Sequence, residues 1–514
     1  MASALRAALR ADASAELGTG HLRRCLSLAQ ALADTGFDVV VLGSGDRDVF
    51  MSIAQAYPFE VRWLGVSPTI GDADRSLQVL QSFAPDWVVV DHYLLDANWH
   101  RTLKTGTGAC VLAIDDLADR LLAPDLLLDH NPHPDPRQKY AGRIDPRTPA
   151  LMGPRFALLR PAYATAPRHV PAETVRSIGI FMGGTDPRNA CAAALLACRE
   201  RAGFDGPVEI VSSRSSPHLA HLARLCGQWP DTTLTLDLPD LREFFARHDL
   251  QLGSGGGAAL ERCCIGAPTL AIAVADNQLV ALPHLSAQGA LQWVGSDLPI
   301  ANDASTDGLL KAALGDAIRA LLDAPVQRRQ ALSGRAMRLV DGLGSRRVAA
   351  VMQVAAGGSL VVRHADAGDE QLILDWANET SARANAFNPR PIDPDAHRHW
   401  FAARLADASA CCLLVLESAN ALPVAQVRFD RTASGWEISY SVDAAFRGWG
   451  VGRRALSLAF DELARRHGPS PLTARVMLHN PASVAVFDQL GFARERVHDH
   501  RGEHWLFSRQ PTTS

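Results

Sequence analysis

The sequence predicts two consecutive α/β domains, each with a doubly wound parallel sheet, followed by a smaller α+β domain. Its 514 residues leave room for about three domains of roughly 100–200 residues each. Short apolar runs alternate with helical patterns as far as about residue 356, which is typical of strands buried on both faces of a parallel sheet. After Gly357–Gly358 this alternation stops, so we expect the domains to span 1–160, 161–356 and 359–514.

Composition excludes several classes of protein. Hydrophobic residues make up 47% and charged residues 21%, which excludes a mostly disordered chain, a collagen-like fibre and a small disulfide scaffold. The 51 basic and 55 acidic residues leave a net charge of −4 without a basic tail, so we expect no nucleic-acid or anionic-membrane partner.

Cysteine usage and the N-terminus predict the compartment. The nine cysteines include no C-x-x-C pair, so we expect neither a metal site nor a disulfide framework. No stretch approaches 18 apolar residues, and the first ten residues lack the apolar core of a secretion signal. These observations predict a cytoplasmic protein without a metal; they do not indicate its oligomeric state.

In the first domain, the alternation assigns five strands and three helices. The expected strands are Phe37–Gly43, Glu60–Leu64, Trp87–Asp91, Val111–Asp115 and Leu126–Asp129, and the expected helices are His21–Asp34, Asp72–Phe83 and Asp96–Lys104. Two proline-rich stretches, Asn131–Pro154 and Pro161–Pro171, are expected to separate this domain from the next.

The second domain repeats the pattern. The expected strands are Ser177–Met182, Val208–Val211, Leu250–Leu252, Thr269–Ala273 and Leu291–Val294, and the expected helices are Pro187–Arg201, Pro217–Leu225, Ala258–Ile265, Gln278–Gln288 and 306–356. Two such domains in tandem would form a cleft at the carboxyl ends of their strands, where α/β sheets bind ligands.

The third domain differs in its pattern. We expect strands at Val361–His364 and Leu413–Glu417, and an antiparallel pair formed by Val424–Asp430 and Trp436–Val442. A glycine-rich turn, a helix over Gly452–Arg466 and a final strand–helix–strand complete this domain.

The first candidate site follows Arg10-Ala-Asp-Ala-Ser14, where Gly18 and Gly20 precede His21. The glycines allow a ligand to approach the backbone, and the helix that starts near His21 points free N–H groups at it. The helix dipole disfavours the imidazolium form, which keeps His21 able to accept a proton. A glycine loop with an incidental surface histidine is the alternative interpretation.

Two more glycine turns follow strands of the second domain. Gly183, Gly184 and Thr185 fit a phosphate-facing turn, although Asp186 and Pro187 also fit an ordinary helix start. Later, Gly255, Gly256 and Gly257 open a helix that carries Glu261, and three successive glycines favour close approach of a ligand. Carboxylates placed like Glu261 often hold ribose hydroxyls. The remaining candidates are Asp12, within Arg10–Ser14, and Asn277 and Gln278, which come after the next expected strand of the second domain.

The third domain carries Arg447-Gly-Trp-Gly-Val-Gly452 between a strand and a helix. In such an R-x-x-G-x-G turn, successive backbone amides at a helix N-terminus grip a pyrophosphate. Asn480 stands seven residues before Phe487, and Gly491-Phe492 follows, which makes the combined pattern specific.

At these residues the chain resembles known families. Residues 1 to about 355 resemble the UDP-sugar hydrolases of pseudaminic acid biosynthesis, which are Rossmann-like and related to GT-B glycosyltransferases. The matching segments are Arg10–Ser14, Gly18–Cys25, Trp87–Tyr93, Met182–Pro187, Glu261–Cys264 and Asp276–Gln278. The resemblance implies release of UDP from UDP-2,4-diacetamido-2,4,6-trideoxy-β-L-altropyranose by water, with His21 as base and with Glu261 and Asn277 as substrate contacts. Gly257–Leu260 departs from that family, which often has Ser or Thr and Trp there.

Residues 359–510 resemble the GNAT acetyltransferases, which bind acetyl-CoA. The resemblance implies Glu437 as the base for an amine and implies that the acetyl-CoA site is formed by Val442, Arg447, Gly448, Gly450, Val451, Gly452, Asn480 and Phe487. That family usually has, in place of Phe487, a tyrosine that protonates the departing thiolate. Because the same pathway contains a GNAT enzyme that acetylates the 4-amino group of the UDP-sugar precursor, we expect one chain to catalyse both steps.

Three other functions fit the same motifs. The first two domains could transfer the sugar to an acceptor other than water, and the third could acetylate protein N-termini or other amines. The departures at Phe487 and at Gly257–Leu260 also leave open a nucleotide-sugar-binding module with a degenerate transferase.

Overall fold

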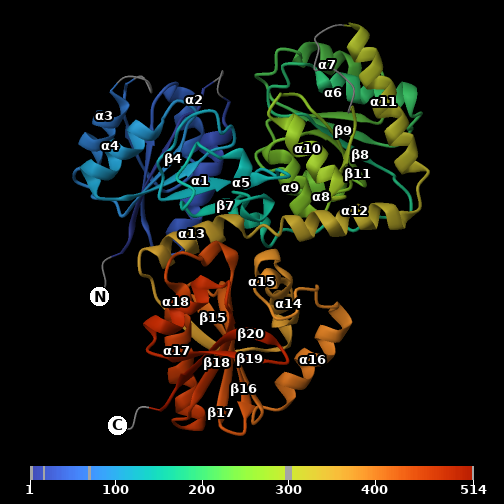
Figure 1. Cartoon of the computed structure of the whole chain (residues 1–514). Coiled ribbons are helices and arrows are strands. Elements are labelled where there is room, and N and C mark those ends of the chain that lie inside the picture. The colour runs from blue at the N-terminus through green and yellow to red at the C-terminus, as the bar shows by residue number, and fades with distance from the viewer. Residues whose placement is uncertain (1–3, 15–17, 67–70, 296–303, 512–514) are drawn as a thin grey trace. The chain divides into compact units, whose positions relative to one another are not determined.

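The computed structural model describes residues 4–14, 18–66, 71–295 and 304–511, which form three sheets (Figure 1). One sheet lies in each of the three expected domains. Contacts divide the chain into two compact units, Met1–Ala349 and Ala350–Ser514. The division falls inside helix α13 (Gly344–Ala355), whereas the sequence suggested a hinge at Gly357–Gly358.

The first sheet is parallel throughout, with the strand order β3-β2-β1-β4-β5-β6-β7. Its strands are β1 (Arg6–Ala11), β2 (Asp38–Gly43), β3 (Glu60–Trp63), β4 (Trp87–Asp91), β5 (Cys110–Ile114), β6 (Leu126–Asp129) and β7 (Ala150–Met152). Its helices are α1 (Gly20–Asp34), α2 (Arg47–Ala54), α3 (Asp72–Leu80), α4 (Ala97–Thr107) and α5 (Pro136–Lys139). The expected strands are all present, and the fold class of this domain is confirmed.

The central strand β1 is the main element that the sequence analysis missed. It consists of alanine, leucine and arginine without a β-branched residue, so its intrinsic strand signal is weak. Arg10 can lie in the core because Asp12 and Asp72 accept hydrogen bonds from its guanidinium.

The two proline-rich stretches are not linkers. The stretch Asn131–Pro154 contains α5 and the edge strand β7, and the stretch Pro161–Pro171 places Tyr163 fully buried in the core of the second domain. The prolines indicate the starts of short elements here, because Pro136 begins α5 and Pro149 immediately precedes β7.

The second sheet is also parallel, in the order β10-β9-β8-β11-β12-β13. Its strands are β8 (Ile178–Phe181), β9 (Val208–Ser212), β10 (Thr232–Leu236), β11 (Leu250–Ser254), β12 (Thr269–Ile272) and β13 (Gln292–Trp293). Its helices are α6 (Ala190–Leu196), with a continuation over Ala197–Arg201, then α7 (Leu219–Cys226), α8 (Arg242–Arg247), α9 (Gly257–Ile265), α10 (Gln278–Ala287), α11 (Ala304–Leu322), α12 (Val326–Leu339) and α13.

Two expected helices of this domain differ from the structure. The stretch 306–356 is three helices, because Pro325 precedes α12 and the positive φ of Gly342 (+85°) follows it. The helix expected from Pro187 begins at Ala190, since the Asp186 carboxylate accepts hydrogen bonds from the amides of Ala190 and Cys191.

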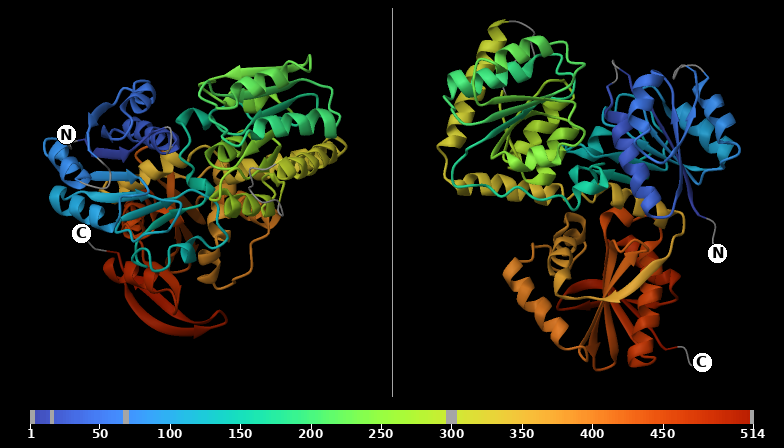
Figure 2. Two further views of the ribbon diagram at one scale, coloured as in Figure 1. Left: turned by 90° about the horizontal axis from the view of Figure 1, so that it is seen from above. Right: turned by 180° about the vertical axis from the view of Figure 1, so that it is seen from behind.

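The third sheet is mixed, with the order β14-β15-β16-β17-β18-β20-β19. Its strands are β14 (Leu360–His364), β15 (Cys411–Ser418), β16 (Pro423–Thr432), β17 (Gly435–Val442), β18 (Leu472–Met477), β19 (Ala493–Asp499) and β20 (Gly502–Arg509). Its helices are α14 (Glu370–Asn378), α15 (Thr380–Ala384), α16 (Pro394–Ala406), α17 (Val451–His467) and α18 (Pro481–Gln489), and α16 and α17 lie on opposite faces of the sheet (Figure 2). The expected antiparallel pair is β16 and β17; β20 and α14–α16 were not expected.

The strands β17 and β18 separate partway along their length. They pair in parallel only at Trp436–Ile438 against Leu472–Ala474, although β17 continues to Val442 and β18 to Met477. The strands therefore leave a wedge in the middle of a sheet, next to the start of α17.

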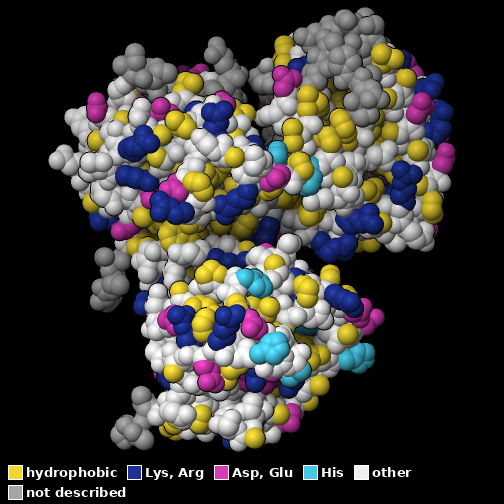
Figure 3. Space-filling view, in the orientation of Figure 1, with side chains coloured by type: hydrophobic (Ala, Val, Ile, Leu, Met, Phe, Trp, Pro, Cys, Tyr) yellow, Lys and Arg dark blue, Asp and Glu magenta, His cyan; other side chains and the backbone are white. Residues whose placement is uncertain are grey.

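All nine cysteines are free thiols. Within the described residues, no helix has the length and apolar character that crossing a membrane requires. On the face shown in Figure 3, basic side chains are scattered among acidic and hydrophobic ones.

Candidate functional site

His21 lies in the first turn of α1 and is paired with a buried carboxylate. Its Nδ1 atom is 2.6 Å from Oδ1 of Asp91, the last residue of β4, and the two side chains are 10% and 0% exposed. β4 neighbours β1, so the sheet order brings the end of β4 beside the loop that leaves β1. In this arrangement the Nδ1–H group donates to Asp91 and leaves Nε2 to accept a proton.

Arg24 holds the same carboxylate, and its Nη2 also lies 3.1 Å from His21 Nδ1. Its Nε is 2.5 Å from Asp91 Oδ2, and its Nη2 is 2.7 Å from Oδ1. Burial favours the protonated acid, yet the Arg24 guanidinium and His21 keep the pKa of Asp91 well below its usual range. Asp91 is therefore charged when it orients His21.

Two further polar residues complete this cluster. The ring of Tyr93 meets the ring of His21 edge-on at 4.5 Å between centroids. Burial and the Asp116 carboxylate raise the pKa of Tyr93 well above its usual value, so its hydroxyl stays protonated. The segments Gly18–Cys25 and Trp87–Tyr93 matched a family pattern, but we predicted no role for Arg24, Asp91 or Tyr93 within them. The available signal was the position of Asp91 at the carboxyl end of a parallel strand.

Asp12 does not lie where we expected. It is 2% exposed, and its carboxylate accepts hydrogen bonds from Arg10 and, at 2.7 Å, from the amide of Ser44, with Nε2 of His92 3.3 Å away. These partners occupy both oxygens, so Asp12 joins β1 to the loop after β2 instead of contacting a substrate. Gly18, which has φ = +74°, and Gly20 each have open space where a Cβ would be.

In the second domain, glycine is required for different reasons at Gly253, which lies in β11, and at the glycines that follow this strand. A Cβ at Gly253 would lie 2.3 Å from the guanidinium of Arg262, and a Cβ at Gly255 would lie 2.9 Å from the Gln278 side chain. Gly256 has φ = +73°, and Gly257 faces open space. Only Gly256 and Gly257 thus leave room on the outer side of the turn for a ligand.

The remaining candidates of this domain differ in their freedom to bind. Gln278 ties two loops together, because its side-chain oxygen accepts from the amides of Gly255 (3.1 Å) and Val274 (3.0 Å). Asn277 is exposed and makes no capping bond at the start of α10. Burial raises the pKa of Glu261, although Arg160 and the Tyr163 hydroxyl oppose this shift.

The turn after β8 is open. Gly183 has φ = +102°, Thr185 is exposed, and among the described residues other than their chain neighbours none comes within 4 Å of where a Cβ of Gly183 or Gly184 would be. This turn can accept a group that approaches its backbone amides closely.

In the third domain, Arg447–Gly452 forms the start of α17 beside the wedge between β17 and β18. Gly448 (φ = +87°) and Gly450 (φ = +70°) adopt left-handed backbone, and among the described residues only its chain neighbours lie close to where a Cβ of Gly450 would be. Val451 is buried at the start of the helix, and Val442 ends β17. An open glycine turn at a helix N-terminus, as in this glycine cradle, is typical of sites that bind a pyrophosphate.

Two predicted contacts of this cradle already have protein partners. The Arg447 guanidinium bonds to the carbonyl of Val442, to Ser381 and to Glu379, so its cation is shared with an acidic side chain. The Asn480 side chain caps α18 by accepting from the amide of Ser483.

Glu437 faces two cations. Arg475 donates to one carboxylate oxygen, and Nη1 of Arg501 is 3.4 Å from the other. Burial opposes the effect, yet Arg475 and Arg501 lower the pKa of Glu437. A carboxylate with a lowered pKa is a weaker base.

Phe487 is 1% exposed and packs against Phe492, Phe507 and Tyr440. The Tyr440 hydroxyl, on β17, is 3.1 Å from Ser483 Oγ in the first turn of α18.

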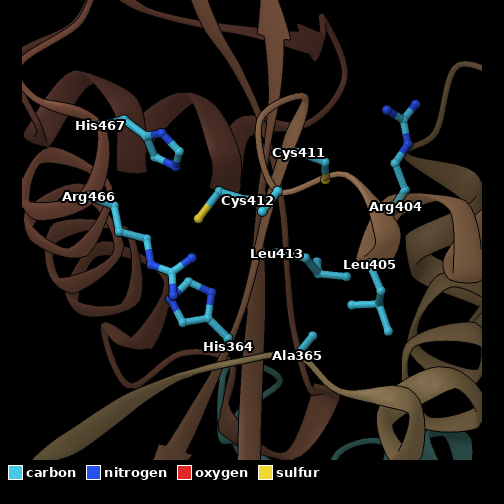
Figure 4. A pocket seen from close by; sticks show the side chains of 10 residues that line it. His364, Ala365, Arg404, Leu405, Cys411, Cys412, Leu413, Arg466 and His467 are labelled. Atoms are coloured by element: carbon cyan, nitrogen blue, oxygen red, sulfur yellow. The ribbon is translucent and has the colours of Figure 1, made fainter.

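One pocket of this domain, of about 190 Å³, lies at the opposite end of α17 (Figure 4). His364, Arg466, His467 and Cys412 line it on the α17 side of β15. Because α17 rises by about 1.5 Å per residue from Val451 to His467, this pocket is roughly a helix length from the glycine cradle.

Comparison with known proteins identifies relatives of both parts. Residues 359–493 match the family model of the acetyltransferase (GNAT) domain. The UDP-2,4-diacetamido-2,4,6-trideoxy-beta-L-altropyranose hydrolase of Campylobacter jejuni is 23% identical over 55% of this chain and 97% of its own length. An uncharacterised protein of Methanocaldococcus jannaschii is 20% identical over 98% of this chain and 99% of its own. A solved structure of a candidate UDP-N-acetylglucosamine 2-epimerase from Listeria monocytogenes is 16% identical, with a TM-score of 0.48, over 69% of this chain and 97% of that one.

Proposed function

We propose that this protein is a bifunctional UDP-sugar enzyme. Its third domain transfers an acetyl group from acetyl-CoA to the 4-amino group of a UDP-amino sugar, and its first two domains hydrolyse the resulting UDP-2,4-diacetamido-2,4,6-trideoxy-β-L-altropyranose to UDP and the free sugar. The observation that carries the hydrolase assignment is the His21–Asp91 pair, on a chain that aligns with nearly the whole length of a hydrolase of that name.

In the proposed hydrolysis, His21 Nε2 takes a proton from water as the oxygen attacks the anomeric carbon. The bond between that carbon and the diphosphate oxygen breaks, and UDP leaves with the bonding electron pair. Asp91 stabilises the imidazolium formed at His21, and the Arg24 guanidinium keeps Asp91 ionised. Gly183–Thr185 and Gly256–Gly257 are the turns that we propose to contact the nucleotide, with Glu261 and Asn277 beside it.

In the proposed acetyl transfer, the open glycine cradle at Gly448 and Gly450 and the wedge between β17 and β18 would hold acetyl-CoA, which supplies the acetyl thioester. Glu437 accepts a proton from the acceptor amine, directly or through water, as the amine nitrogen bonds to the acetyl carbon. The C–S bond of the thioester breaks, and the CoA thiolate leaves with the bonding electron pair and takes up a proton from water, because Phe487 has no hydroxyl to donate one. Arg475 and Arg501, which are 27% and 39% exposed beside it, suit an acceptor that carries negative charge, as a UDP-sugar does.

The test is to incubate the full chain with the UDP-4-amino sugar and acetyl-CoA and to follow CoA and UDP release. We expect CoA release first, and UDP release only after acetylation or when the diacetamido sugar is supplied directly. CoA release with peptides or polyamines alone would assign the third domain to another amine. Transfer of the sugar to an added acceptor, without free sugar, would identify a glycosyltransferase. Release of neither product would leave a binding module.

A further inference from the structure

The Gly253–Gly257 loop, which runs from the end of β11 into α9, covers a buried arginine, Arg262. Among the described residues its guanidinium forms no ion pair with a carboxylate, and it lies over the Phe245 ring, 5.7 Å from the centroid. Arg262 is 0% exposed on α9, and its guanidinium occupies the space that a Cβ at Gly253 would need. It donates one hydrogen bond, to the carbonyl of Ser254, and its Nε and Nη1 have no hydrogen-bond partner among the described residues. A buried donor without a partner is costly, so this arrangement requires an explanation.

The other two fully buried arginines show how this chain ordinarily satisfies such a group. Arg10 pairs with the carboxylates of Asp12 and Asp72. Arg329 donates to four backbone carbonyls, those of Ala172, Glu173, Leu321 and Ala324, and only its Nε has no partner among the described residues. Arg262 alone among these three has a single carbonyl, and burial lowers its pKa to about 10, which still leaves it charged near neutral pH.

The position of this charge indicates what it acts on. Side chains of a helix point back toward its N-terminus, and the guanidinium of Arg262 lies against Gly253 and Ser254 at the end of β11, just before the glycines that open α9. The first turn of α9 has no acidic residue, so the charge adds to the positive end of the helix dipole. On the outer side of the same turn, Gly256 and Gly257 leave the backbone accessible.

We propose that Arg262 is the buried countercharge of an anion site at the Gly253–Gly257 loop, and that it makes this loop prefer a diphosphate to a monophosphate. Arg262 does not touch the ligand. Its charge attracts the anion across the loop, through buried surroundings of low polarity, so Arg262 is a positioning residue. This proposal rests on the proposed function, because it identifies the diphosphate as part of the nucleotide that the loop binds.

The test compares the affinities of the full chain for UDP, UMP and inorganic pyrophosphate by calorimetry. Replacing Arg262 with an uncharged side chain of similar length, in Arg262→Met, should weaken UDP by about tenfold or more and UMP by less, because a buried charge acts more strongly on the more highly charged ligand. The matched control is Arg329→Met, which removes an equally buried arginine of the same domain. It should lower the melting temperature and leave the ratio of UDP to UMP affinity unchanged.

Arg262→Lys provides a second measurement that does not depend on the stability of the methionine variant. A buried ammonium has a lowered pKa, so the UDP affinity of this variant should be near that of the wild type at about pH 6 and should fall toward about pH 9. The titratable groups that act on Arg262 are Cys263, Glu261 and Tyr163. Burial raises the pKa of Cys263 to about 12 and that of Tyr163 well above its usual value, so neither changes charge in this interval; the wild type at each pH accounts for Glu261 and for the ligand.

The outcomes separate the two proposals. An unchanged ratio of UDP to UMP affinity in Arg262→Met, or an equal change in Arg329→Met, overturns the role of Arg262 and leaves the proposed function intact. Binding of pyrophosphate without binding of UDP by the wild type supports the anion site and overturns the nucleotide assignment. A wild-type chain that binds neither overturns both.

Discussion

The two residues assigned as bases, His21 and Glu437, differ in their charged partners. His21 pairs with the buried Asp91 carboxylate, whose charge the Arg24 guanidinium balances, 3.1 Å from the same ring nitrogen. Glu437 faces two arginines, which stabilise its charged form and lower its pKa. From the sequence, both were expected to act as bases: His21 at a helix start after a glycine turn, and Glu437, through the GNAT resemblance, on the strand before the glycine-rich loop. The comparison teaches that the identity of a candidate base is less informative than the charged groups next to it.

The largest expected effect is at His21. In His21→Asn, kcat for release of UDP should fall by about 10²–10⁴-fold, because a positioned general base is lost, while the affinity for UDP stays similar. Arg23→Met is the control and should retain activity, because Arg23 lies on the same turn of α1 but its side chain is exposed and bonds to Thr19. Near-normal turnover of His21→Asn would remove His21 from the mechanism.

A smaller effect is expected at Glu437. Glu437→Gln should lower kcat/KM for CoA release by only about tenfold at about pH 6, which is below the usual range for a general base, because the arginines weaken its basicity. The defect should shrink as the pH rises, since more of the acceptor amine is then neutral without help. A loss above about 10³-fold that is the same at every pH would show that the two bases are equivalent after all.

The comparison can be sharpened by removing the cation. In Arg475→Met, the Glu437 carboxylate loses the partner that favours its charged form, so its pKa should rise toward the usual value. The acid limb of the pH profile for CoA release should therefore move to higher pH. Arg496→Met, which removes an exposed arginine paired with Glu503, should not move it. A shift to lower pH would contradict the assignment of that limb to Glu437.

The smallest effect is expected at Phe487. Phe487→Tyr places a hydroxyl among Phe492, Phe507 and Tyr440 in a site that is 1% exposed, so the ring should stay in place and the hydroxyl should find little access to the thiolate. The change in kcat should stay below the about 10²-fold that a well-placed proton donor supplies. A larger rise, measured as CoA release at saturating acetyl-CoA, would show that this position lacks only a hydroxyl.

The fold of the first two domains was largely predictable, because their strands are apolar runs that lie buried in the two parallel sheets. β4 and β6 were assigned to the residue, since valine and leucine carry a strong strand signal. β1 was missed because it contains a buried arginine, Arg10. This residue pairs with Asp12, two residues later, and with Asp72, which is far away in the sequence, and such pairing leaves no periodic pattern.

The glycine turns of the candidate site could be predicted from sequence motifs. The side-chain contacts between residues far apart in the sequence could not. The glycines at Gly448 and Gly450 have the left-handed conformation that the turn pattern implies. The contact between Asp91 and Arg24 could not be predicted without the sheet order, because 66 residues of chain lie between them. Asp12 was misjudged for the same reason: its partner Ser44 belongs to another strand end.

The wedge between β17 and β18 offers a place where ligand binding would stabilise the folded protein. Where the sheet parts, β17 keeps only β16 as a neighbour and β18 keeps only β20, and a ligand that fills the gap binds the folded state and not the unfolded one. At a free ligand concentration of 100 times Kd, such binding adds about 2.7 kcal/mol to the free energy of unfolding. Unfolding, and with it proteolysis, would then slow when acetyl-CoA is abundant in the cell and accelerate when it is scarce, so the amount of enzyme would follow the supply of its own acetyl donor.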